Sequence, residues 1–176
     1  MKKLILLPIF AIAGKLAFPQ YKPVDWKSFV VFRIKNFGFE VSGSFTGLSG
    51  NILFDPQHPA DAAFDVSVNS NSVNTDNQMR DEHLRKSGYF DVEKYPHIRL
   101  ISDKVAPSTK KDVFLFTGKL TLKNHTKDIS FPFTAEPVDG GYRFKGTFSI
   151  NRKDFEVGGT STISDKLDVM LDITAK

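Results

Sequence analysis

The sequence of 176 residues predicts an all-β protein: a closed antiparallel β-barrel of about eight strands with one short helix inserted mid-chain. Apolar and polar residues alternate in segment after segment, as in antiparallel strands that have one face in the core and one in water. Turn residues separate these segments, and only one stretch near the middle follows a helical pattern. About nine strand segments result, and a sheet of that size usually curls closed or splits into two layers. With one helix inserted mid-chain, the closed barrel is favoured.

The first thirteen residues have the pattern of a secretory signal peptide. Lys2 and Lys3 precede an apolar run from Leu4 to Ala13, and Ala11-Ile12-Ala13 is a small-x-small cleavage site. The run is too short for a membrane span, and the alternative is a hydrophobic N-terminal strand. We expect residues 1–13 to be removed and residues 14–176 to form a single domain, periplasmic or secreted and not membrane-spanning.

The composition excludes several functional classes. The formal net charge is +4 and basic residues are interspersed with acidic ones, which indicates a solvated surface and no nucleic-acid partner. The chain has no cysteine, which excludes a cysteine nucleophile, thiol redox chemistry and thiolate metal ligands. The histidines show no metal-binding spacing, so we expect neither a metal nor a cofactor. The oligomeric state stays open, with a dimer as one possibility.

The strand segments are read from their alternation and from the turns between them. The expected strands are residues 28–35, 39–46, 48–54, 62–69, 97–104, 114–123, 128–135, 142–150 and 167–174. Asp139-Gly140-Gly141 is a strong hairpin signal and Asn124-His125 a weaker one. Pro132 falls on the outward-facing phase, which predicts an interrupted strand or a sheet edge there.

Residues 76–86 are expected to form the helix. Thr75 and Gln78 have the spacing of a capping box, in which Thr75 would cap the helix N-terminus. Arg80 and His83 lie beside the apolar Met79 and Leu84, at the border between charged and apolar helix surface. An amphipathic helix of this kind in a β-rich chain most often plugs or covers something, so we place it at the lip of the barrel.

The interior can be either a packed core or a container. Gly43, Gly118 and Gly146 fall on the inward-facing phase, where a glycine either allows a sharp bend or leaves room for a ligand. An eight-stranded barrel is wide enough to fill itself or to hold one small ligand. Phenylalanine on many strands provides an apolar wall without hydrogen-bond demands, which suits a long hydrocarbon. Each buried methylene contributes about 0.8 kcal/mol.

Several motifs resemble one known family. Ser72-Val73-Asn74-Thr75, residues 80–84 and Phe90-Asp91-Val92 followed by Tyr95-Pro96 are similar to the central signature of the YceI family of lipocalin-like, polyisoprenoid-binding proteins. Further matches occur in the same order at residues 28–32, 43–45, 118–121, 126–129 and 151–155, so that the resemblance covers nearly all of the chain after about Tyr21. It implies a lipocalin-like barrel that encloses a polyprenyl chain or a similar lipid.

The leading hypothesis is therefore a non-enzymatic carrier of a polyisoprenoid, an isoprenoid quinone or a fatty-acyl compound. The expected apolar wall consists of Phe32, Val41, Phe45, Phe64, Val66, Met79, Leu84, Phe90, Phe114, Phe116, Phe131, Phe133, Phe144, Gly146 and Phe148. The residues expected at a ligand head group are Arg80, His83 and Arg152. Against these roles, Arg80 would merely pair with a neighbouring carboxylate, and Arg152 would belong to a solvated loop.

Two other classes of protein remain as alternatives. Alternating strands also fit an outer-membrane β-barrel, in which the apolar face points outward to lipid. The other alternative is a hydrolase that uses His83 with Asp81 or Glu82. Adjacent helical residues point about 100° apart, so these three side chains are not expected to converge on one atom. No catalytic residue is assigned.

Overall fold

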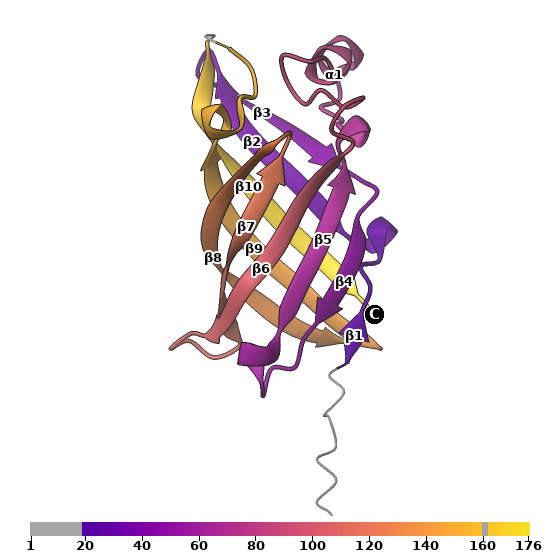
Figure 1. Ribbon diagram of the computed structural model, residues 1–176, viewed down its shortest axis with the longest axis vertical. Helices are drawn as coiled ribbons and strands as arrows, with labels where there is room; N and C mark the ends of the chain where they lie inside the picture. The colour runs from indigo at the N-terminus through magenta and orange to yellow at the C-terminus, as the bar shows by residue number, and fades with distance from the viewer. Residues whose placement is uncertain (1–18, 160–161) are drawn as a thin grey trace, which may run out of the picture.

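The computed structural model describes residues 19–159 and 162–176, in which ten strands form one curled antiparallel sheet (Figure 1). The strands are β1 (Gln20–Tyr21), β2 (Phe29–Asn36), β3 (Phe39–Phe45), β4 (Ser49–Leu53), β5 (Ala63–Asn69), β6 (His97–Pro107), β7 (Val113–Leu122), β8 (His125–Val138), β9 (Gly141–Asn151) and β10 (Ile163–Ala175). The helix is α1 (Gln78–Leu84), and the 3₁₀ turns are η1 (Asp25–Lys27), η2 (Pro59–Asp61), η3 (Ser70–Ser72) and η4 (Arg152–Phe155). The predicted signal peptide lies outside the described residues.

Consecutive hairpins build most of the sheet. The order is β1-β4-β5-β6-β7-β8-β9-β10-β2-β3, so the last strand returns beside β2. The predicted turn at Asp139-Gly140 joins β8 to β9, with Val138 opposite Gly141. Strand β8 is not interrupted at Pro132, which pairs with Leu115 of β7. The β8–β9 ladder extends from Val138 back only to Phe133, so Pro132 lies where β8 has an open edge on its β9 side.

The closed ladder of about eight strands is not confirmed. The sheet has ten strands, and its edge strands β1 and β3 do not pair with each other. Backbone hydrogen bonds instead join the edges to other segments at two places. Lys22 N donates to Lys176 O at 2.7 Å beyond the end of β1, and Ser44 N of β3 donates to Asn74 O at 2.8 Å.

The end of the sheet remote from α1 is filled by aromatic side chains. Phe54, which follows β4, is fully buried and packs edge-on against Phe114, Tyr142 and Phe144, with ring centroids 5.1–5.2 Å apart. Phe64 adds further edge-on contacts to this cluster. Edge-to-face aromatic pairs contribute stability beyond the area that they bury, so this end is the packed core of the protein.

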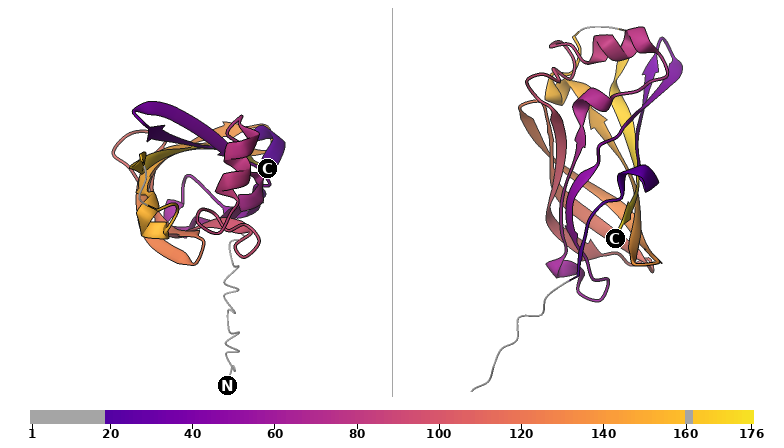
Figure 2. Two further views of the ribbon diagram at one scale, coloured as in Figure 1. Left: turned by 90° about the horizontal axis from the view of Figure 1, so that it is seen from above. Right: turned by 90° about the vertical axis from the view of Figure 1, so that its right-hand side faces the viewer.

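Helix α1 lies over part of the opposite end (Figure 2). It begins later than predicted, and its N-cap is Asn77, whose side chain accepts from Arg80 N at 3.0 Å. Thr75 does not cap the helix because Asp76 adopts a left-handed φ of 57°, which turns the chain between Thr75 and the first helical residue. Within the described ranges, no helix is long and apolar enough to cross a membrane.

Candidate ligand-binding cavity

An apolar cavity of about 200 Å³ lies inside the curled sheet next to α1, whose Arg80 and Leu84 contribute to its lining. Strands β2, β3, β5, β6, β7, β9 and β10 form its wall, and α1 with the segment that follows covers it. The aliphatic residues that line it are Val30, Val31, Ile34, Val41, Leu48, Val66, Val68, Leu84, Ile98, Leu100, Leu120, Leu122, Ile150, Val157, Ile163, Leu167, Val169, Leu171 and Ile173. Such a surface binds by excluding water and has no preference for a polar group.

The strand register explains why these residues face one another. Val169 of β10 lies between Phe32 of β2 and Phe148 of β9, and Leu100 of β6 lies between Val66 and Leu120. Side chains directly across an antiparallel pair point to the same face, so each such row forms a continuous strip of wall. Val169 packs against the core but is only partly buried although it faces inward, because part of its side chain borders the cavity.

Seven of the residues predicted for the wall line this cavity. They are Phe32, Val41, Phe45, Val66, Leu84, Phe90 and Phe148. Most of the aliphatic wall was not predicted, because the expected wall consisted mainly of phenylalanines. The inward phase of Leu167, Val169 and Leu171 was the signal that identifies them.

Six predicted wall residues lie instead in the packed aromatic end. They are Phe64, Phe114, Phe116, Phe131, Phe133 and Phe144, all of them buried, and none of them lines the cavity. Each ring packs against others of the set: Phe116 stacks on Phe131 at 4.9 Å, and Phe114 on Phe133 at 5.6 Å. These rings leave no cavity at this end, because phenylalanines that lie opposite each other on adjacent strands pack together and fill the interior.

The inward-facing glycines hold no room for a ligand. A Cβ atom at Gly146 would stand 2.8 Å from the Phe131 ring, and one at Gly43 would stand 2.4 Å from the Phe32 ring. At Gly118 the obstacles are the Phe116 ring and the backbone of β6 where its register shifts, after Ser102. The Phe131 ring therefore packs directly against the backbone of Gly146, and Gly146 does not line the cavity.

Met79 is also not part of the wall. Its side chain is 80% exposed on the outer surface of α1, while the adjacent Arg80 lines the cavity. The helix thus turns Arg80 and Leu84 toward the interior.

Arg80 is held at the border of the cavity by Thr75. Its Nε donates to Thr75 Oγ1 at 2.7 Å and its Nη2 to Thr75 O at 2.6 Å, while Nη1 has no partner among the described residues. Thr75 N and Oγ1 both donate to the buried carboxylate of Asp81. Asp81 therefore orients Thr75, which orients the guanidinium, and one edge of Arg80 stays available.

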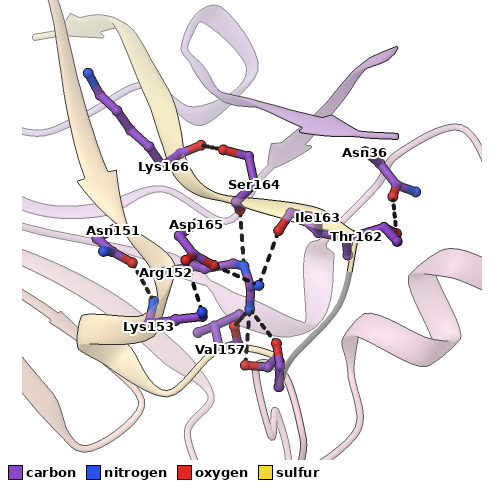
Figure 3. Close-up of polar contacts among 12 residues, drawn as sticks. Asn36, Asn151, Arg152, Lys153, Val157, Thr162, Ile163, Ser164, Asp165 and Lys166 are labelled. Atoms are coloured by element: carbon purple, nitrogen blue, oxygen red, sulfur yellow. Dashed lines mark hydrogen bonds and ion pairs between the residues drawn. The ribbon is translucent and has the colours of Figure 1, made fainter. Parts of the chain in front are cut away.

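His83 and Arg152 are placed differently from Arg80. The His83 ring is exposed and packs on Tyr89 with centroids 4.7 Å apart, outside the cavity lining. Arg152 is buried, touches the cavity wall, and uses its guanidinium to bind the following loop (Figure 3). It donates to the backbone oxygens of Val157, Gly158, Gly159, Ile163 and Ser164 and pairs with Asp165 at 3.0 Å. Arg152 is thus an internal support of the loop that joins β9 to β10.

Arg99 of β6 also lines the cavity, but its guanidinium is held by an acidic neighbour. Arg99 donates to both carboxylate oxygens of Asp65 across β5 and β6, at 2.8 and 2.7 Å, and this hydrogen bonding lowers the pKa of Asp65. In the aromatic end of the sheet, where Tyr142 packs against Phe54, burial raises the pKa of Tyr142. The described residues contain no group of side chains suited to hold a metal ion. The lining of the cavity is mainly apolar, and Arg80, one of its three arginines, has a guanidinium nitrogen, Nη1, with no partner among the described residues.

The curled sheet, the internal apolar cavity and the helix over one end define a class of small β-proteins that have a cavity in one half of the sheet and a packed core in the other. Residues 21–175 match the YceI-like domain, and the chain belongs to this family. It is 36% identical over 135 residues to a UPF0312 protein of Photorhabdus laumondii, which covers 73% of this chain and 69% of that protein. A UPF0312 protein of Pseudomonas syringae pv. tomato is 35% identical over 154 residues, or 84% of this chain and 79% of that protein.

Solved structures share the fold. BcnA of Burkholderia cenocepacia superposes with a TM-score of 0.79 at 24% identity, over 84% of this chain and 96% of that one. The YCEI protein of Campylobacter jejuni gives a TM-score of 0.69 at 26% identity, over 98% and 99% of the two chains. A polyisoprenoid-binding domain from Saccharophagus degradans gives a TM-score of 0.69 at 15% identity, over 89% and 97%.

Proposed function

We propose that the protein is a non-enzymatic carrier that binds one long apolar chain in its cavity: a polyisoprenoid, an isoprenoid quinone or a fatty-acyl compound. The cavity carries this proposal, because most of the residues that line it are aliphatic or aromatic. Binding of such a chain needs no polar contact, since each methylene removed from water contributes about 0.8 kcal/mol. The structural neighbour from Saccharophagus degradans, named as a polyisoprenoid-binding domain, supports the choice of ligand class.

Arg80 is proposed to meet the polar end of the ligand. Its Nη1 edge is available and its other nitrogens are fixed by Thr75. An oriented guanidinium binds a phosphate or a carboxylate through paired hydrogen bonds. An anionic lipid would therefore place its chain in the cavity and its head group at Arg80.

The container is proposed to work as a closed, lipocalin-like barrel. The two bridges that involve Lys22 and Ser44 support this, because they tie the sheet edges to neighbouring segments by backbone hydrogen bonds. The proposal includes export to the periplasm or the medium after loss of residues 1–13, on the strength of the Lys2-Lys3 pattern and the apolar run. It requires only one copy of the chain and is compatible with a dimer.

The two alternatives gain no support. Asp81 is bound by Thr75 and His83 packs on Tyr89, so neither is directed at the other as a catalytic pair would be. The outward phase of β7 carries Thr117, Lys119 and Thr121, whereas a strand facing lipid exposes apolar residues at those positions.

The proposal is tested by identifying the bound ligand and by measuring competition between a lipid and a fluorescent probe for the cavity. Native mass spectrometry of the purified protein, followed by organic extraction, would identify a co-purifying lipid. Geranylgeraniol should then displace a fluorescent apolar probe from the wild type. Val169→Phe should weaken that binding at least tenfold, because the added ring fills the middle of the wall. Met170→Phe, the adjacent outward change, is the matched control and should bind normally. Equal binding by wild type and both variants would overturn the proposal.

A further inference from the structure

The turn of the β2–β3 hairpin consists of Phe37 and Gly38, and both residues have left-handed backbones. Their φ angles are 50° and 83°. A two-residue hairpin turn of this kind favours Asn-Gly, and a bulky residue in the left-handed region is an outlier. Phe37 is also 71% exposed, and Phe39 just after the turn is 77% exposed. Neither backbone preference nor packing against the residues that the structure describes accounts for an aromatic residue at Phe37.

These phenylalanines border the cavity. Asn36, immediately before the turn, and Val41, two residues after Phe39, both line it. On the other side, the exposed Met79 of α1 adjoins Arg80, which also lines it. The hairpin tip and α1 lie at the same end of the molecule (Figure 2). Exposed apolar side chains therefore flank the cavity at the end where its wall stops.

The charge near the tip is suited to a phospholipid surface. The hairpin strands carry Arg33 and Lys35 against one acidic residue, Glu40. Arg33 lies 3.7 Å from Glu40, whereas the Lys35 ammonium group forms no ion pair among the described residues. A lysine two residues from an exposed aromatic is able to reach lipid phosphates while its methylenes stay in the interface.

We propose that the hairpin tip docks on the surface of a lipid bilayer, with Phe37 and Phe39 inserted at the level of the head groups. Met79 touches the same surface from α1, so the mouth of the cavity faces the membrane. The apolar ligand then passes between bilayer and cavity without crossing water. This inference rests on the proposed function, because only a protein that exchanges a lipid gains from such docking.

A bilayer fits this surface better than a second copy of the chain. A stable protein interface buries roughly 800 Å² and 20–30 residues on each partner, whereas the exposed apolar surface here consists of three side chains. Insertion of a few aromatic side chains into a membrane interface, in contrast, suffices for reversible attachment. A dimer formed through the tip is therefore one of the outcomes that the experiment must detect.

The test compares Phe37→Asn with the wild type in the full chain, purified from the soluble fraction. Asparagine tolerates the left-handed conformation, so the variant should unfold at the same or a higher denaturant concentration. Vesicles of phosphatidylethanolamine and phosphatidylglycerol should bind the wild type in flotation and bind Phe37→Asn about tenfold more weakly. Phe39→Thr, which keeps a residue with high β-propensity, should show the same loss. Phe29→Asn, the same exchange at the exposed far end of β2, should float like the wild type.

Binding of geranylgeraniol without vesicles separates this inference from the function on which it rests. The expected result is unchanged solution binding by Phe37→Asn together with slower transfer of the lipid from vesicles. Equal flotation of wild type and both tip variants would overturn the docking surface, as would a wild type that does not float. A concentration-dependent dimer that Phe37→Asn abolishes would assign the tip to a contact between copies. If neither the wild type nor any variant bound geranylgeraniol in solution, the carrier function itself would be refuted.

Discussion

The Phe131 ring lies against Gly146 so closely that a Cβ atom there would stand 2.8 Å from it. The ring is also stacked between Phe116 and Phe148, at 4.9 and 4.7 Å, and cannot move aside. Gly146→Ala should therefore lower the free energy of unfolding by about 1–3 kcal/mol. Gly88→Ala, where an added Cβ meets nothing within 4 Å, is the control. Urea denaturation measures both, and weaker ligand binding at unchanged stability would place Gly146 on the cavity after all.

Arg80→Ala should discriminate between ligands of equal chain length. Charged hydrogen bonds contribute roughly 1.5–3 kcal/mol, so the variant should lose affinity for geranylgeranyl diphosphate about tenfold more than for geranylgeraniol. The matched control is Arg85→Ala, because the Arg85 guanidinium donates to Asn71 O and Val73 O and does not line the cavity. Titration calorimetry with both lipids gives the ratio. Equal losses for both lipids would mean that Arg80 only supports Thr75.

Arg152→Ala should act on stability and leave that ratio unchanged. The change removes the guanidinium that donates to the backbone oxygens of Val157 and Gly158. Unsatisfied buried acceptors cost about 1–3 kcal/mol each, so we expect a loss of roughly 3 kcal/mol or more. Lys153→Ala removes a half-exposed cation that pairs with the same Asp165 and should cost less than about 1 kcal/mol. A selective loss of the diphosphate in Arg152→Ala would show that Arg152 reaches the ligand.

The exported protein should begin at Gly14. The Lys2-Lys3 start, the apolar run and the Ala11-Ile12-Ala13 site motivate this expectation. Intact-mass measurement of the periplasmic or secreted protein should match residues 14–176. Recovery of exported material that retains residues 1–13 contradicts the cleavage.

Alternation along the chain was sufficient to predict the strands, because inward and outward residues are distinguished by polarity alone. It identified the inward phase of Val169 and Leu171 as readily as that of Phe131 and Phe133. It could not tell which inward side chains fill the interior and which surround a hollow. That difference depends on register between strands that are distant in sequence, such as β10 with β2, and on Phe54, which enters the core from outside any regular strand.

The helix was predicted near its true position but not its cap or its polar contacts. Thr75 has the residue type and spacing of an N-cap, yet the left-handed Asp76 moves the cap to Asn77. This frees Thr75 to bind Arg80 and Asp81. Arg80 and Arg152 are alike as sequence signals, and only the backbone oxygens that surround Arg152, such as those of Val157 and Ser164, make it a structural support. Tertiary hydrogen bonding of this kind has no local signature.

The fully buried Phe54, with its ring of edge-on neighbours, lies apart from the cavity wall. The fold should therefore be maintained whether or not the proposed lipid is bound, and the empty form should remain able to bind it again. The aliphatic lining, for its part, is under weaker packing constraint than the aromatic end. Over evolutionary time its side chains are able to change size and shape, and with them the preferred cargo, while the architecture survives.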